Sequence, residues 1–208
     1  EKGIVEIKEI REYRRPSISN EFSDKKFSLS LEQQDIVDSF AADFDMGIRT
    51  PSLIHGVTGS GKTEVYMEII AHVIKRGGQA IMLIPEIALT FQTMMRFSRR
   101  FGDRVTYLHS KLSPGERYDQ IVRAEKGDVD IVIGPRSALF TPFHNLQVII
   151  IDEEHEGSYK AETVPKYHTV ETAAERARLA GAALVLGSAT PSVDSYMHAR
   201  RGEYRLYE

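Results

Sequence analysis

The chain has 208 residues, a formal net charge of −3 at pH 7, 41% hydrophobic residues and no cysteine. This composition suits a globular domain with a sizeable core, and the lack of cysteine excludes disulfides and cysteine-ligated zinc. The acidic balance argues against nucleic-acid binding by bulk charge, although it is compatible with a local phosphate site. No stretch approaches the roughly 20 apolar residues of a membrane helix, so we expect a cytoplasmic protein with no membrane partner.

The first 28 residues differ in character from the rest of the chain. They are dense in charge, weakly periodic and interrupted by Pro16, so we predict a linker or peripheral segment over residues 1–28 and one domain over residues 29–208. The chain opens with Glu1 instead of methionine. We therefore expect it to be a piece of a longer protein, with a processed product as the alternative.

A helix is predicted to begin after Ser30, because Ser30 and Gln33 fit a capping box. Apolar residues then recur on one helical face, namely Leu31, Ile36, Val37 and Phe40. Beyond this helix, short apolar runs alternate with amphipathic segments. The runs cover residues 52–55, 80–84, 105–108, 130–133, 148–151 and 183–186.

Several of these runs are continuous in Val, Ile and Leu, which is typical of parallel strands buried on both faces. Helix signals lie between them: Gly77 and Gly78 end one helix, Ser113 with Pro114 begins another, and Gly181 ends a third. The alternation predicts an α/β fold with a mostly parallel central sheet and helices on both faces.

A phosphate-binding loop is predicted directly after the first strand. The sequence GVTGSGKT satisfies G-x-x-x-x-G-K-[ST] in full, and its glycines let backbone N–H groups turn toward phosphate oxygens. Lys62 is expected to reach the β- and γ-phosphates and Thr63 to ligate Mg²⁺; a plain helix cap is the alternative for Thr63. The expected nucleotide-binding residues are Gly56, Val57, Thr58, Gly59, Ser60, Gly61, Lys62 and Thr63.

Two carboxylates follow the run at 148–151, at the edge of the sheet where ligands collect in open α/β folds. We expect Asp152 to hold Mg²⁺ and Glu153 to orient and deprotonate the attacking water. The alternative is a helix-opening turn that favours negative charge.

Four blocks resemble the motifs of superfamily 2 helicases. DEEH at 152–155 resembles the helicase box, SAT at 188–190 motif III, PEIALT at 85–90 motif Ia, and GPRSA at 134–138 motif Ib. The flanking spellings LHSKLSPGER, IIIDEEHEGSYK and PKYH resemble the DEEH-box DNA helicases that restart bacterial replication. This resemblance covers about residues 29–200.

The resemblance implies a RecA-like P-loop NTPase lobe that uses ATP and Mg²⁺ for translocation on, and unwinding of, DNA at stalled forks. Its implied partners are single-stranded and forked DNA, single-stranded-DNA-binding protein and other primosome proteins. After Thr190 only 18 residues remain (208 − 190), with no further strand–helix series expected. We therefore expect the first of two lobes, nearly inactive alone, with zinc confined to the region of the missing second lobe.

The same resemblance implies roles for individual residues. Gln33 matches an adenine-contacting glutamine, with the capping box as its alternative. His155 is expected to join Lys62, Asp152 and Glu153 in catalysis by coupling hydrolysis to strand movement. Residues expected to share that coupling are Ser188, Ala189 and Thr190.

DNA contacts are expected from motifs Ia and Ib, through Glu86, Thr90, Arg136 and Ser137. The loop at 156–168 mixes aromatic and basic residues, and Tyr159 and Lys160 are expected to contact DNA from it. The alternative is a surface loop whose tyrosines pack on the sheet. The basic residues between Arg96 and Arg104 are interpreted as the water-facing side of a helix.

Three other functions remain open. One is the lobe of a different superfamily 2 translocase, against which the flanking spellings argue. Another is an ATP-responsive binding module that never hydrolyses. The third is a nucleotide kinase, in which the SAT block has no task and no acceptor-binding lid is evident.

Overall fold

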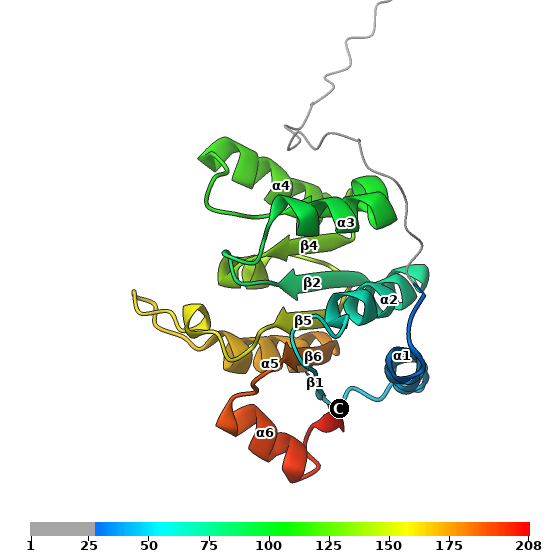
Figure 1. The fold of residues 1–208 in the computed structure, drawn as a ribbon. Coiled ribbons are helices and arrows are strands. Elements are labelled where there is room, and N and C mark those ends of the chain that lie inside the picture. Colours follow the sequence, from blue (N-terminus) through cyan, green and yellow to red (C-terminus); the bar gives the residue numbers. More distant parts are fainter. Residues whose placement is uncertain (1–27) are drawn as a thin grey trace, which may run out of the picture.

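The computed structural model describes residues 28–208, so the predicted linker lies outside the described residues apart from Ser28. Within them, one sheet contains β1 (Ser52–His55), β2 (Gln79–Leu83), β3 (Val105–Tyr107), β4 (Ile131–Gly134), β5 (Leu146–Asp152), β6 (Ala183–Ser188) and β7 (Arg205–Tyr207). The strand order is β3-β4-β2-β5-β6-β1-β7, and each neighbouring pair is parallel (Figure 1). β1 to β6 confirm the six predicted runs, with ends that differ by at most two residues.

The helices are α1 (Leu31–Asp45), α2 (Lys62–Lys75), α3 (Phe91–Phe101), α4 (Pro114–Lys126), α5 (Thr169–Ala180) and α6 (Val193–Arg200). Short 3₁₀ turns cover Gly102–Arg104, Arg136–Phe140 and Gly157–Tyr159. The predicted capping box at Ser30 and Gln33 is formed, and Gly181 ends α5 in the left-handed conformation. Leu31 was wrongly placed on the buried face of α1, because it sits in the first turn and is 85% exposed.

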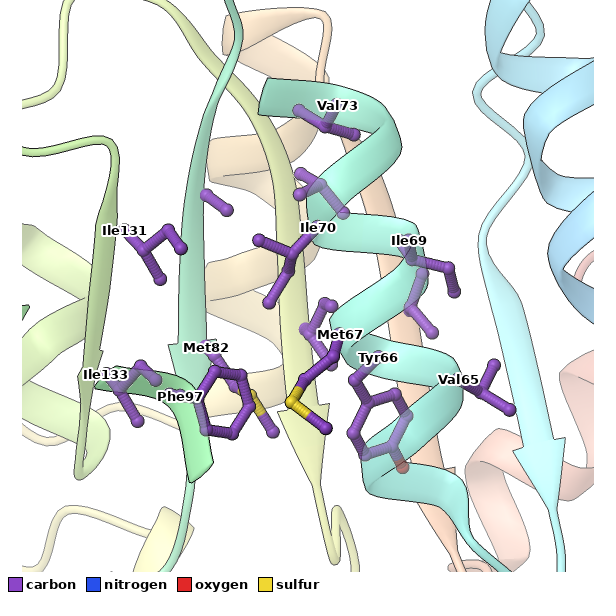
Figure 2. Packing of buried hydrophobic residues seen from close by; sticks show 14 of the residues in the cluster. Val65, Tyr66, Met67, Ile69, Ile70, Val73, Met82, Phe97, Ile131 and Ile133 are labelled. Carbon is purple, nitrogen blue, oxygen red and sulfur yellow. The ribbon is translucent and has the colours of Figure 1, made fainter. Parts of the chain in front are cut away.

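Helices cover both faces of the sheet, as predicted. On one face, residues of α1, α2 and α3 share a core with alternate strand residues such as Val148 and Ile150. On the other face, residues of α4, α5 and α6 share a second core with Ile149 and Ile151. Figure 2 shows the first of these cores, where Met67 and Ile70 of α2 meet the strands. Because β5 is buried on both faces, its sequence is nearly continuous in apolar residues.

A helix and a strand follow Thr190, where the sequence predicted no further strand–helix series. α6 leads into β7, which pairs with β1; Arg205 donates its backbone N–H to Pro51 O at 2.8 Å. The Arg205 guanidinium also pairs with Asp43 of α1 at 2.6 Å. β7 is only three residues long and half-buried, so no apolar run announced it. It belongs to the same sheet and makes β1 an internal strand.

Candidate nucleotide-binding site

Strand register brings the predicted motifs together at the carboxyl edge of the sheet. β6 lies between β1 and β5, with Asp152 opposite Gly187 and His55 opposite Ser188. Beyond the strand ends, Gly56 donates its N–H to Ser188 O at 3.1 Å and Glu154 donates to Gly187 O at 3.0 Å. The phosphate loop, the acidic box and the SAT block are therefore tied to one another by backbone hydrogen bonds.

The phosphate loop depends on its glycines. Gly59 and Gly61 both have φ of +82°, in the left-handed region that L side chains rarely adopt. A Cβ on Gly61 would also lie 2.3 Å from Nε2 of Gln33. At the start of α2, Lys62 donates to Gly56 O at 2.7 Å, and its Nζ lies 3.8 Å from Oε1 of Glu153. This buried ammonium thus bridges the loop and the acidic box.

Gln33 links α1 to the phosphate loop while it caps the helix. Its Oε1 accepts from Ser30 N at 2.9 Å, and its Nε2 donates to Ser60 O at 2.7 Å. The two ends of one amide therefore serve the cap and the loop simultaneously. The capping box is confirmed, whereas adenine contact by Gln33 stays a prediction.

Asp152 is the last residue of β5, and Glu153 follows it directly. Burial, reinforced by the charge of Glu153, raises the pKa of Asp152 to about 6. Hydrogen bonds from Tyr66 Oη at 3.2 Å and Glu153 N at 3.1 Å reach its Oδ1 and act in the opposite direction. Glu153 has φ of +48°, a conformation that non-glycine residues rarely adopt and that is enriched at functional sites.

His155 and the SAT block form one hydrogen-bonded group. His155 Nδ1 lies 2.7 Å from Ser188 Oγ, which accepts the backbone N–H of Thr190 at 2.9 Å. The same His155 Nδ1 lies 3.7 Å from Oε2 of Glu153, so the imidazole stands between the SAT block and the acidic box. Thr190 takes part through its backbone N–H, and Ala189 only connects Ser188 to Thr190. The coupling role of His155 and of these three residues stays a prediction.

Glu154, the third letter of the box, has a structural task that sequence reasoning missed. Its buried carboxylate accepts from Ser192 N at 2.6 Å, Ser192 Oγ at 3.0 Å and Ser195 Oγ at 3.0 Å. Ser192 is the N-cap of α6. The box is thereby anchored to the helix after the SAT block. The only sequence signal was the pair of serines at that helix start.

The residues present fit a magnesium ion held jointly with a nucleotide. Within residues 28–208, no group of three or more His, Cys, Asp or Glu side chains is placed to hold a metal. Mg²⁺ commonly takes one or two protein oxygens and completes its shell with water and substrate phosphates. Asp152, a partly buried carboxylate with a raised pKa, is a donor whose charge such a cation would offset.

Motif Ia residues have structural partners in addition to their predicted DNA role. Glu86 Oε1 accepts from Ser110 N at 2.8 Å, and this hydrogen bond holds the pKa of Glu86 below its ordinary value. Thr90 is the N-cap of α3 and accepts from Thr93 N at 3.3 Å. Both side chains are exposed, and their contact with DNA stays a prediction.

The loop after β5 corrects one predicted DNA contact. Tyr159 is only 1% exposed and donates its hydroxyl to Asp152 O at 2.8 Å, so its ring has no face for a base. The alternative in which tyrosines pack on the sheet is right for this residue. Lys160 and Ser137 are exposed. Arg136 donates to Ser158 O at 2.8 Å and Lys160 O at 2.7 Å, so its guanidinium braces this loop.

The arginines between 96 and 104 are engaged within the fold. The ion pairs are Arg96 with Glu64, Arg100 with Glu68 and Arg104 with Asp130.

Among the described residues, no helix is long and apolar enough to cross a membrane.

A parallel sheet flanked by helices, with a glycine-rich phosphate loop after β1 and an acid pair after β5, defines a RecA-like P-loop NTPase lobe. The model of the DEAD/DEAH box helicase family matches residues 29–198, and the chain belongs to this family.

Two curated relatives show which members of the family the chain resembles. The chain is 44% identical to Replication restart protein PriA of Bacillus subtilis over 99% of the chain and 26% of that protein. It is 46% identical to PriA of Chlamydia pneumoniae over 86% of the chain and 24% of that protein. The chain thus spans about a quarter of the length of these relatives.

Solved structures show the same fold. RecG bound to a three-way DNA junction matches with a TM-score of 0.65 and 24% identity, over 88% of this chain and 24% of that one. The UvsW helicase from Bacteriophage T4 matches with a TM-score of 0.60 and 15% identity, over 89% of this chain and 61% of that one.

Proposed function

We propose that the chain is the ATP-binding first lobe of an ATP-dependent DNA helicase that acts in replication restart. The observation that carries the proposal is the meeting of the phosphate loop, Asp152 with Glu153, and the Ser188 group at the ends of three adjacent strands. The similarity to PriA proteins over almost the whole chain supports the restart function.

The proposed chemistry is ATP hydrolysis. Backbone N–H groups of residues 56–61 would cradle the phosphates, and Lys62 would move from the loop carbonyls to the β- and γ-phosphates. Mg²⁺, held through Thr63 and Asp152, would neutralise phosphate charge. Glu153, beside Lys62, would orient water for attack on the γ-phosphate. Hydrolysis would be slow in this lobe alone, because arginines from a second lobe are expected to stabilise the transferring phosphate.

DNA would bind along the neighbouring part of the same edge. The loops after β2, β4 and β5 carry the exposed candidates Thr90, Ser137 and Lys160, and the loop after β5 extends beyond the strand ends (Figure 1). Such side chains suit hydrogen bonding and charge pairing with a single strand's backbone. We propose that Glu86 and Arg136 contribute to DNA binding indirectly, because their hydrogen bonds hold the loops that contact DNA.

By similarity to PriA, the proposed substrates are single-stranded and forked DNA, with single-stranded-DNA-binding protein and other primosome proteins as partners. Zinc would belong to the second-lobe region, since this chain has no cysteine. A protein that acts on bacterial replication forks would work in the cytoplasm.

The test joins this chain to the second lobe of the family and measures ATP hydrolysis with and without forked DNA. DNA-stimulated turnover that disappears in Glu153→Gln would support the motor function, because the substitution removes the carboxylate while it keeps the side-chain shape. Turnover that DNA does not change would contradict it. Nucleotide binding without hydrolysis in any joined form would instead favour the ATP-responsive binding module.

A further inference from the structure

The hydroxyl of Tyr66 reaches the candidate site although its ring belongs to the core. Tyr66 lies on the helix that begins with Lys62 and is fully buried between α2 and the sheet. Figure 2 shows its oxygen directed toward the carboxyl ends of the strands, whereas Met67 and Ile70 are wholly apolar neighbours. A phenol in this place carries one polar atom into the site, and that atom needs a partner.

Gly187 makes room for this hydroxyl. A Cβ on Gly187 would lie 1.6 Å from the Tyr66 oxygen, far inside any permissible contact. The backbone of Gly187 is an ordinary strand residue without positive φ, so the need for glycine here is steric. The pair Tyr66 and Gly187 therefore acts as a fitted contact between α2 and β6.

The partner of the hydroxyl is Asp152. Its Oδ1 accepts from Tyr66 Oη at 3.2 Å and from Glu153 N at 3.1 Å. Among residues 28–208, no hydrogen bond reaches its Oδ2. Two donors on one oxygen fix the rotation of the carboxylate and leave the other oxygen for a cation.

We propose that Tyr66 is a positioning residue that sets the Asp152 carboxylate for Mg²⁺-bound nucleotide. This inference rests on the proposed function, because Asp152 serves Mg²⁺ only if the site binds a metal–nucleotide complex. The residue works through Asp152 and contacts neither the nucleotide nor the metal. Loss of its hydroxyl should weaken the contribution of Mg²⁺ to binding and spare the contacts that the loop makes to phosphate.

The test uses Tyr66→Phe in the full 208-residue chain, with a fluorescent ADP analogue titrated in Mg²⁺ and in EDTA. The ratio of the two affinities measures the Mg²⁺ contribution. Tyr107→Phe is the matched control, because Tyr107 is also a buried tyrosine of the same core, bonded to Met94 O at 2.6 Å. Asp152→Asn gives the value expected when the Mg²⁺ carboxylate is lost.

We expect Tyr66→Phe to lower the Mg²⁺ contribution about tenfold, the effect of losing one hydrogen bond to a charged group, with unchanged affinity in EDTA. Tyr107→Phe should match the wild type in both conditions. Gly187→Ala, which displaces the hydroxyl without removing it, should behave as Tyr66→Phe does and serves as the second variant should the first fold poorly.

The outcomes separate this inference from the function on which it rests. If the wild type gains no affinity from Mg²⁺, the proposed function of the site is wrong. If the wild type gains and both Tyr66→Phe and Gly187→Ala gain equally, the positioning role is wrong. An equal loss in Tyr107→Phe would also overturn it, because the effect would then come from a loosened core.

Discussion

The surroundings of Asp152 explain its raised pKa. Burial is the larger cause of its raised pKa, and the neighbouring charge of Glu153 is the next. Hydrogen bonds from Tyr66 and Glu153 and the charge of Lys62 oppose these two effects without cancelling them. With its pKa raised, the Asp152 carboxylate is ionised at a cost when no cation is bound. A bound cation would offset that cost, which suits a residue that binds a metal ion.

We predict that Asp152→Asn stabilises the apo protein at pH 8. The pKa of about 6 lies above the ordinary 3.8, so the folded state binds this proton more tightly than the unfolded chain does. Stability from that proton is present below about pH 4 and is lost as pH rises through about 6. Asparagine should therefore raise the free energy of unfolding by on the order of 2 kcal/mol at pH 8.

Urea unfolding without Mg²⁺ at pH 8 and pH 5 measures this effect. The gain should be smaller at pH 5, because part of the wild-type carboxyl is then protonated. Asp128→Asn, at an exposed position after α4, should change little at either pH. A variant no more stable than the wild type at pH 8 would show that the carboxylate is not destabilised by its burial.

The short turn at Gly157–Tyr159 illustrates how an irregular element is held in place. Arg136 donates to the carbonyls on either side of Tyr159, and Thr169 Oγ1 donates to Tyr159 O at 2.6 Å. The Tyr159 hydroxyl completes the arrangement by reaching Asp152 O. The first part of the loop after β5 is thus held by hydrogen bonds to the rest of the fold, and Lys160 is exposed.

We predict that Arg136→Ala speeds hydrogen exchange in this loop by about tenfold or more, since hydrogen bonds to charged groups contribute about 1.5–3 kcal/mol. The reporting amides are those of Tyr159 and Lys160, which donate within the turn at 3.0 Å each. Lys160→Ala removes a charge from the same loop and should leave exchange unchanged. Unchanged exchange in Arg136→Ala together with weaker single-stranded DNA binding would assign Arg136 to direct DNA contact instead.

Elements that depend on local pattern were predictable from the sequence. Continuous apolar runs identified β1 to β6, and the loop spelling identified the start of α2. β7 escaped because three half-buried residues carry no pattern. Tyr66 was missed for another reason, because it looks like an ordinary core residue. Tyr159 was named but assigned to DNA, because its loop mixes aromatic and basic residues. Only the packing of α2 on β6, and of the loop on β5, brings their hydroxyls to Asp152.

At the scale of the whole molecule, the strand order divides the carboxyl edge into two neighbouring regions. The proposed nucleotide contacts follow β1, β6 and β5, whereas the proposed DNA contacts follow β5, β2 and β4. β5 belongs to both regions and ends at Asp152. A movement of the loop after β5 would therefore reach the nucleotide side through Tyr159 and the carbonyl of Asp152.

The nucleotide region also depends on β7, which covers the outer edge of β1. Ser52, Leu53 and Ile54 pair with Arg205, Leu206 and Tyr207. The side chains of Leu206 and Tyr207 pack on the two cores, and His55, the residue before the phosphate loop, lies 3.2 Å from Glu208 through Nδ1 and Oε1. Without this strand, β1 would present an unpaired edge beside the phosphate loop.

Removal of residues 205–208 should therefore lower the free energy of unfolding by about 2–4 kcal/mol, mostly through lost burial of two large side chains. Arg205→Gln keeps the strand and removes the guanidinium with its ion pair to Asp43 and its hydrogen bond to Ser39 Oγ, so it should cost about 1 kcal/mol or less. Urea unfolding of both variants measures the difference. Equal losses would mean that the ion pair, rather than strand pairing, secures β7. An unchanged stability after the deletion would mean that β1 does not need its outer neighbour.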